Sequence, residues 1–159
     1  MNIFVDVGAH VGESLAVALD GSWRFDHVHS FEPDPACIRE MQTRFAPFIA
    51  DGRLTLHAVA LGGAEGEVVL SGDNAGGAAS VLKDFIADDA RRISVPMIDV
   101  NAFLDREIPD GARLYIKMNC EGGEVAILER LAERADVSKD RKSTRLNLVT
   151  SLSRMPSSA

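Results

Sequence analysis

Short apolar segments rich in β-branched and aromatic residues alternate with helical patterns along most of this chain. The first such segment, residues 3–7, ends at Gly8, and apolar residues with helical spacing follow it up to Leu19. A short segment that is apolar at four of its five positions is typical of a buried strand in a parallel sheet, where both faces are covered. Alternating strands and helices therefore predict an α/β fold with a doubly wound, mostly parallel sheet and helices on both of its faces.

The other elements follow the same alternation. The further predicted strands are residues 27–31, 54–59, 67–71, 93–95 and 114–118, with a Gly/Ala-rich loop at 73–80. The predicted helices are residues 11–19, 35–50, 99–104 and 124–135. In the last helix we expect Val125, Leu128 and Leu131 to face the core, because their spacing places them on one side.

Composition and charge exclude several classes of protein. Lys and Arg number 17 and Asp and Glu number 24, so the net charge is −7, which disfavours nonspecific binding to nucleic acid or to an anionic membrane. No apolar segment approaches the roughly 18 residues of a membrane span, and the first residues lack the basic start of a signal peptide. The two cysteines and four histidines show no metal-ligand spacing. We therefore expect a cytoplasmic protein without a metal site, and the sequence does not indicate its oligomeric state.

The composition changes near Ser138. Residues 139–159 contain five basic residues and one acidic residue, are rich in serine and lack a sustained apolar period. One interpretation is a disordered basic tail. The other is that residues 142–147 and 155–159 resemble translated sequencing-adapter read-through, which is found at the ends of assembled gene fragments. On either interpretation we expect residues 1–138 to form the functional domain, truncated at its C-terminal end.

Ligands of doubly wound sheets bind beyond the carboxyl ends of the strands, so the loops that follow the strands are where chemistry is expected. The first of these loops carries Gly8 and Gly12 directly after Asp6. Glycine permits a tight turn at the first position and close packing of the helix against the strand at the second. The start of the helix offers free N–H groups to an anion. A purely structural turn would need the same glycines.

The second loop carries Glu32, 24 residues after Gly8. An acidic residue at this spacing typically binds two ribose hydroxyls of a nucleotide-type cofactor. Asp34 precedes Pro35 and is expected to cap the next helix, so Glu32 is the better ribose ligand. A dinucleotide fingerprint would have glycine where His10 stands, and this side chain would crowd a pyrophosphate. The pattern therefore favours S-adenosylmethionine over NAD.

The third loop follows residues 114–118 and carries Lys117, Asn119 and Glu121. These polar groups are either functional or engaged in structural hydrogen bonds. Glu124 is expected to cap the following helix. Cys120 fits a small buried side chain better than a nucleophile.

Together these motifs resemble the FkbM-type methyltransferases. The residues that carry the resemblance are 4–13, 31–33, 57–62, 98–100 and 116–124. The resemblance implies a Rossmann-like, class I methyltransferase fold with S-adenosylmethionine as methyl donor. It also implies O-methylation of a hydroxyl on a small acceptor molecule, such as a metabolite or a sugar.

The resemblance also implies roles for individual residues. The loop from Asp6 through Gly8, Ala9, His10 and Gly12 would bind the donor, Glu32 its ribose, and the segment around Ala60 would lie by its adenine. The family commonly has K-x-D-x-E-G-x-E after the fourth core strand, whereas this chain has Asn119 at the aspartate and Gly123 where alanine is common. Glu121 then becomes the candidate base, with Asn119 and Lys117 orienting the acceptor or supporting the loop.

Two other functions stay open at this point. The first is an NAD-dependent oxidoreductase, which would use the same glycine loop and ribose ligand. The second is an inactive, truncated cofactor-binding fragment. In such a fragment the strand at 114–118 would lack a neighbour, and its edge would be exposed.

Overall fold

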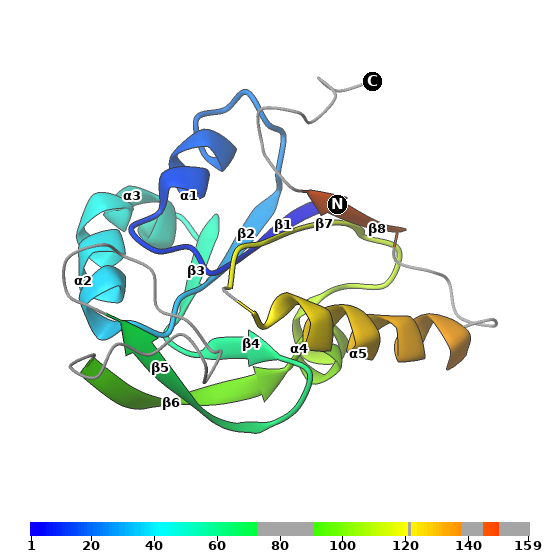
Figure 1. The fold of residues 1–159 in the computed structure, drawn as a ribbon. Helices are drawn as coiled ribbons and strands as arrows, with labels where there is room; N and C mark the ends of the chain where they lie inside the picture. The colour runs from blue at the N-terminus through cyan, green and yellow to red at the C-terminus, as the bar shows by residue number, and fades with distance from the viewer. Residues whose placement is uncertain (73–90, 121, 138–144, 150–159) are drawn as a thin grey trace.

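The computed structural model describes residues 1–72, 91–120, 122–137 and 145–149 (Figure 1). Its main sheet has five parallel strands in the order β3-β2-β1-β7-β8. These strands are β1 (Asn2–Val7), β2 (His27–Phe31), β3 (Leu54–His57), β7 (Arg113–Met118) and β8 (Arg145–Val149). The chain order reverses at β1, which confirms the predicted α/β architecture with a mostly parallel sheet.

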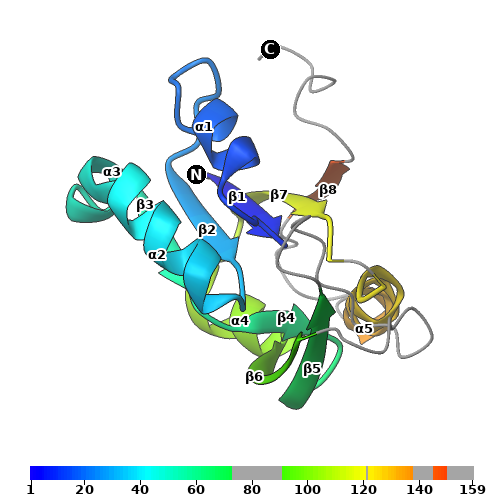
Figure 2. The same cartoon turned by 60° about the vertical axis from the view of Figure 1, so that its left-hand side comes forward.

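Helices cover both faces of this sheet (Figures 1 and 2). One face carries α1 (Glu13–Ala18), α2 (Pro35–Arg44) and α3 (Ala46–Ala50), and the other carries α4 (Val100–Glu107) and α5 (Glu124–Val137). Successive residues of β1 supply both cores: Ile3 and Val5 pack towards α4 and α5, and Phe4 packs towards α1 and α2. This two-sided burial explains why residues 3–5 of β1 are all apolar instead of alternating with polar residues.

A second, three-stranded sheet has the order β4-β6-β5. It consists of β4 (Ala60–Gly62), β5 (Gly66–Gly72) and β6 (Arg91–Asp99), with β5 antiparallel to β6. The two short strands expected at 67–71 and 93–95 are confirmed, and the loop at 73–80 lies outside the described residues. The strand expected at 54–59 ends at His57, because its neighbour β2 ends at Phe31, directly opposite.

The helix expected over residues 35–50 is divided into α2 and α3. Phe45 separates them with φ −109° and ψ 19°, outside the helical region. Pro47 has no N–H with which to continue the helical hydrogen bonds, so the chain turns and restarts. The apolar stripe continues across the break, since Ile38, Met41 and Phe45 are buried and Phe48 packs against them.

The prediction of the buried face of α5 was right for Leu131 and wrong for Val125 and Leu128. Ile127 is fully buried, whereas Val125 is 64% and Leu128 38% exposed. At about 100° per residue, Val125 lies on the side of the helix opposite Ile127. The orientation is set by close packing elsewhere, because a Cβ on Gly63 would lie 2.7 Å from the carbonyl oxygen of Ala126.

The C-terminal segment differs from expectation at residues 145–149. They form β8, which pairs in parallel with β7, and Asn147 Nδ2 donates to the Leu114 carbonyl at 3.2 Å. The prediction of a disordered tail is therefore wrong for β8, whose Leu146 to Val149 sequence suits a strand. β7 has a neighbour on each side, so its expected unpaired edge is absent. The suggested adapter origin of residues 142–147 and 155–159 stays a prediction.

Across the described ranges, no helix is both long and apolar enough to cross a membrane.

Candidate functional site

Three loops meet at the carboxyl ends of β1, β2 and β7. The N–H groups of Gly8 and Ala9 both donate to the Phe31 carbonyl, at 3.0 and 3.1 Å. On the other side of β1, the Asn119 N–H donates to the Val7 carbonyl at 2.9 Å. The backbone of β1 is thus fastened to both neighbouring strands at the point where the predicted site begins.

The glycine loop, residues 8–12, contains three left-handed residues. They are Gly8 (φ 75°), His10 (φ 53°) and Gly12 (φ 85°). A Cβ on Gly8 would overlap the backbone carbonyl of Asn119. A Cβ on Gly12 would lie 2.5 Å from the ring of Phe45, so this glycine allows α1 to approach the end of α2, and not a strand as expected. Both glycines therefore have structural reasons within the protein.

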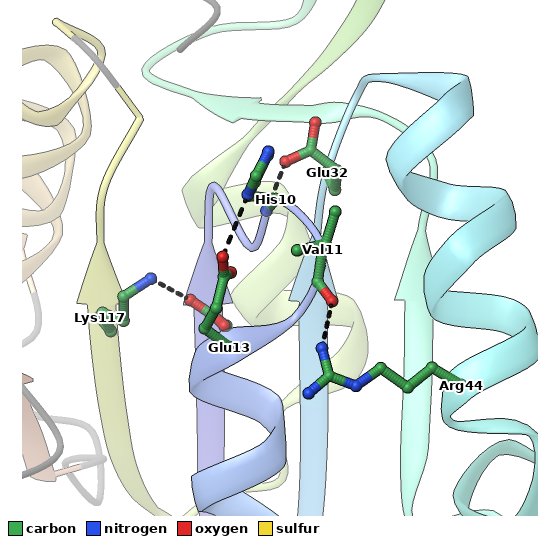
Figure 3. Close-up of polar contacts among 7 residues, drawn as sticks. His10, Val11, Glu13, Glu32, Arg44 and Lys117 are labelled. Carbon is green, nitrogen blue, oxygen red and sulfur yellow. Dashed lines mark hydrogen bonds and ion pairs between the residues drawn. The ribbon is translucent and has the colours of Figure 1, made fainter. Parts of the chain in front are cut away.

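His10 lies at the tip of this loop. Its N–H donates to Oε2 of Glu32 at 2.8 Å, and its ring Nδ1 lies 3.3 Å from Oε1 of Glu13 (Figure 3). Glycine takes left-handed backbone at little cost, whereas histidine does so only occasionally. The bond to Glu32 compensates for this strained conformation and directs the imidazole ring out of the loop towards α1.

Glu32 joins two loops through its carboxylate. Oε2 accepts from His10, and Oε1 accepts the N–H of Asp34 at 2.8 Å. Glu32 is only 8% exposed, and burial raises the pKa of its carboxyl despite these two hydrogen bonds. A carboxylate has about four acceptor positions, so capacity remains for hydroxyl donors. The side chain of Asp34 accepts from Ala36 N–H at 2.7 Å, which confirms its predicted capping of α2.

Asp6 is fully buried at the end of β1. Its Oδ1 accepts from Lys117 Nζ at 2.8 Å, whereas Oδ2 has no hydrogen-bond partner among the described residues (Figure 3). Burial raises the pKa of the Asp6 carboxyl, and the Lys117 ammonium opposes this rise. Ser30, which lies opposite Asp6 on β2, likewise has a buried hydroxyl without a partner in the described parts of the chain.

The loop after β7 contains the remaining candidates. Glu121 lies outside the described residues. Asn119 is exposed, and Lys117 is engaged with Asp6. Glu124, in the first turn of α5, accepts the N–H groups of Cys120 and Gly122 at 2.9 and 2.8 Å, so its role is structural, although it holds the preceding loop and not the free N–H groups of the helix. Burial raises the pKa of the Cys120 thiol to about 12, which agrees with its interpretation as a small buried side chain.

Ala60 belongs to the second sheet. It begins β4 of the second sheet, opposite Met97. The link to the site is indirect: the carbonyl of His57, three residues earlier, accepts the N–H of Glu32 at 3.1 Å. The structure therefore brings Asp6, the glycine loop, Glu32, Lys117 and Asn119 together, and leaves Ala60 at the start of the second sheet.

Sequence reasoning did not predict two further contacts, one at the glycine loop and one between α4 and α5. Arg44, near the end of α2, donates to the carbonyl of Val11 at 3.1 Å and so holds the glycine loop (Figure 3). Asp99, part of the motif at 98–100, caps α4 through Ala102 N–H at 2.9 Å and pairs with Arg130 of α5 at 2.7 Å. Burial alone would raise the pKa of Asp99, but these bonds hold it below its ordinary value.

Comparison with known proteins agrees with this geometry. The sequence model of the family described as "Methyltransferase FkbM domain" matches residues 6–150. The crystal structure of Methyltransferase FkbM from Methylobacillus flagellatus KT has a similar fold, with a TM-score of 0.57 and 22% sequence identity. The alignment covers 92% of this chain and 32% of that one, so this chain spans about a third of that protein. No curated protein matches the chain.

Proposed function

Because the chain belongs to the FkbM methyltransferase domain family, we propose that it is an S-adenosylmethionine-dependent methyltransferase. The acceptor would be a hydroxyl on a small metabolite or sugar. The observation that carries this proposal is the carboxylate of Glu32, which lies at the carboxyl end of β2 and is bonded to the glycine loop. Such a carboxylate is placed to receive the two ribose hydroxyls of a nucleoside.

The residues present fit this cofactor. Glu32 retains acceptor capacity beside the loop, and the buried Oδ2 of Asp6 has no hydrogen-bond partner among the described residues. Both groups are acceptors, which suits a ligand that carries hydroxyls, an ammonium and a sulfonium. Asp6, Gly8, Ala9, His10, Gly12 and Glu32 would hold the donor, and the segment after β3, including Ala60, would approach its adenine.

The loop fits NAD less well. The middle glycine of a dinucleotide loop makes room for the pyrophosphate. Here His10 takes that place, with its N–H already committed to Glu32. A pyrophosphate would lose that donor and meet two carboxylates, Glu13 and Glu32, around the loop. We therefore favour the methyl donor over the dinucleotide.

S-adenosylmethionine would supply the methyl group as a sulfonium. The chain's own contribution would be to hold the acceptor oxygen in line with that methyl, since proximity and orientation supply most of the rate in such a transfer. A carboxylate that takes the hydroxyl proton would add roughly 10²- to 10⁴-fold. Glu121 is the proposed base. Asn119 cannot take a proton and would orient the acceptor.

Isothermal titration of the full chain with S-adenosylhomocysteine and with NAD tests the proposal. We expect S-adenosylhomocysteine to bind and NAD to show no heat at the same concentrations. Binding of NAD alone would replace this proposal with the oxidoreductase. The chain spans about a third of its solved relative, so binding of the donor does not by itself establish methyl transfer, which has to be measured separately. Glu121→Gln should lower transfer and leave the titration unchanged.

A further inference from the structure

Lys117 and Asp6 are direct neighbours across the main sheet. The register of β1 and β7 places Asp6 opposite Lys117, so their side chains leave the sheet on the same face. The ammonium lies 2.8 Å from Oδ1 of a carboxylate that is fully buried, and the lysine side chain itself is 15% exposed. Among the described residues, Glu13, at the start of α1 and paired with His10, is a second carboxylate near this pair (Figure 3).

The pair lies below a junction between two loops. Just beyond it, the N–H of Asn119, two residues after Lys117, donates to the carbonyl of Val7, the residue after Asp6. Gly8 packs so closely on the Asn119 carbonyl that a side chain at this position would overlap it. The glycine loop and the loop after β7 therefore share one contact region, and the ion pair is the charged contact that joins their strands.

We propose that Lys117 is a positioning residue that acts through Asp6, by neutralising it and holding the loop after β7 against the glycine loop. The tests of this proposal that measure donor binding rest on the proposed function, and the test by unfolding does not. The sequence left two roles open for Lys117, orienting the acceptor or supporting the loop, and the proposal takes the second and assigns its action to Asp6.

Burial supplies the physical reason. A carboxylate removed from water is costly as an anion unless a cation faces it, and removal of one partner leaves the other charge uncompensated. Without Lys117, the cation that opposes the effect of burial on Asp6 would be gone, so the carboxyl would favour its protonated form more strongly and would offer a hydrogen-bond donor beneath the loop. Its ionised form would return as the pH rises. A lysine that contacted only the reactants would not make the site sensitive to pH in this way.

Four variants of the full chain separate these cases: Lys117→Met, Lys117→Arg, Asp6→Asn and the double variant Lys117→Met/Asp6→Asn. We expect Lys117→Met to weaken S-adenosylhomocysteine binding by about tenfold at pH 7, and by less at pH 9. Lys117→Arg should stay near wild type, because the guanidinium also neutralises Asp6. In the Asp6→Asn background, the lysine substitution should cost less than about threefold, because contacts within one ion pair are not additive.

Unfolding in denaturant gives a readout that needs no ligand. Burial already raises the pKa of Asp6 above its unfolded value, and in Lys117→Met the opposing ammonium is gone, so the denaturant midpoint of this variant should fall more steeply than that of wild type as pH rises above the ordinary pKa of an aspartate. The double variant should lack this slope. Arg53→Met, which breaks the exposed Arg53–Asp51 pair, serves as the matched control and should follow wild type between pH 5 and 8, above the range in which Asp51 titrates.

A loss of binding by the same factor at every pH and in both backgrounds would overturn the proposal, since Lys117 would then act directly on the ligand. A Lys117→Met midpoint that runs parallel to wild type would overturn it as well. If wild-type protein binds no S-adenosylhomocysteine, the proposed function fails, and the denaturant series still decides whether Lys117 acts through Asp6.

Discussion

Oε2 of Glu32 accepts the N–H of His10 at 2.8 Å, which fixes the glycine loop after β1 to the end of β2. The same carboxylate orders the next loop through Asp34. Glu32 thus supports the backbone around the site in addition to its proposed contact with ribose. The two roles predict different responses to substitution.

Glu32→Gln should weaken S-adenosylhomocysteine binding by about tenfold or more. The amide keeps one acceptor oxygen, but its NH₂ group would face either the His10 or the Asp34 N–H, and a buried donor left unpaired costs about 1–3 kcal/mol. Isothermal titration and denaturant unfolding measure the two effects. Glu40→Gln, which removes an exposed carboxylate from α2, is the control and should change neither. If Glu32→Gln bound S-adenosylhomocysteine with wild-type affinity, Glu32 would not be a ligand of the donor.

Gly12→Ala should destabilise the protein more than Gly21→Ala. Both glycines are left-handed, with φ 85° and 89°, so alanine is strained at both. The new Cβ would meet the Phe45 ring only at Gly12, whereas nothing lies within 4 Å at Gly21. Overpacking of this kind costs about 1–3 kcal/mol beyond the shared strain. Equal losses of unfolding free energy in the two variants would contradict the packing role of Gly12.

The histidines of β2 and β3 predict a loss of stability in mild acid. His29 Nδ1 lies 3.1 Å from His57 Nε2, and burial together with the neighbouring histidines lowers the pKa of His29 to about 3. Below about pH 6.5 the unfolded chain binds a proton at this histidine, whereas the folded chain does not. The contribution of neutral His29 to the free energy of unfolding is therefore complete above pH 6.5 and is lost as pH falls towards 3. The slope is about 1 kcal/mol per pH unit.

Denaturant unfolding between pH 4.5 and 7.5 measures this slope. His29→Phe should make it shallower, because the phenyl ring fits among His57 and Phe103 and does not titrate, while His57, whose pKa burial also lowers, keeps its own contribution. His10→Gln, at the exposed tip of the glycine loop, should keep the slope of wild type. An unchanged slope in His29→Phe would assign the acid sensitivity to other groups.

Asp99→Ala should destabilise the fold without a specific effect on donor binding. It removes the cap of α4, worth about 1 kcal/mol, and the contact with Arg130 of α5. Asp105→Ala breaks the more exposed contact with Arg134 and should cost less. Unfolding and titration of both variants test this. A loss of affinity larger than the loss of stability would give the 98–100 motif a role in binding.

The sequence predicted the parts of the fold that depend on local patterns. The largely apolar β1 and the capping of α2 by Asp34 each follow from the residues within one strand–loop–helix unit. The parallel order of the strands then places these units side by side.

The remainder depends on contacts between distant segments. In α5, Val125, Leu128 and Leu131 have a helical spacing as good as that of Ile127 and Leu131, and only the packing of Gly63 on Ala126 selects the second face. The pairing of β8 with β7 and the anchoring of Val11 by Arg44 likewise join residues more than 30 positions apart. Pro47 was the one visible signal that could have predicted the break between α2 and α3.

The most direct test follows backbone amide resonances by NMR while S-adenosylhomocysteine is added to the full chain. The N–H groups of His10 and Asp34 report on Glu32 from its two sides, and both should shift together in a saturable manner. Gly52 and Gly111 lie in turns that precede β3 and β7, at the amino ends of the strands, and their resonances should not shift. Shifts confined to other residues, or none at saturating ligand, would contradict a donor site built on Glu32 and the glycine loop.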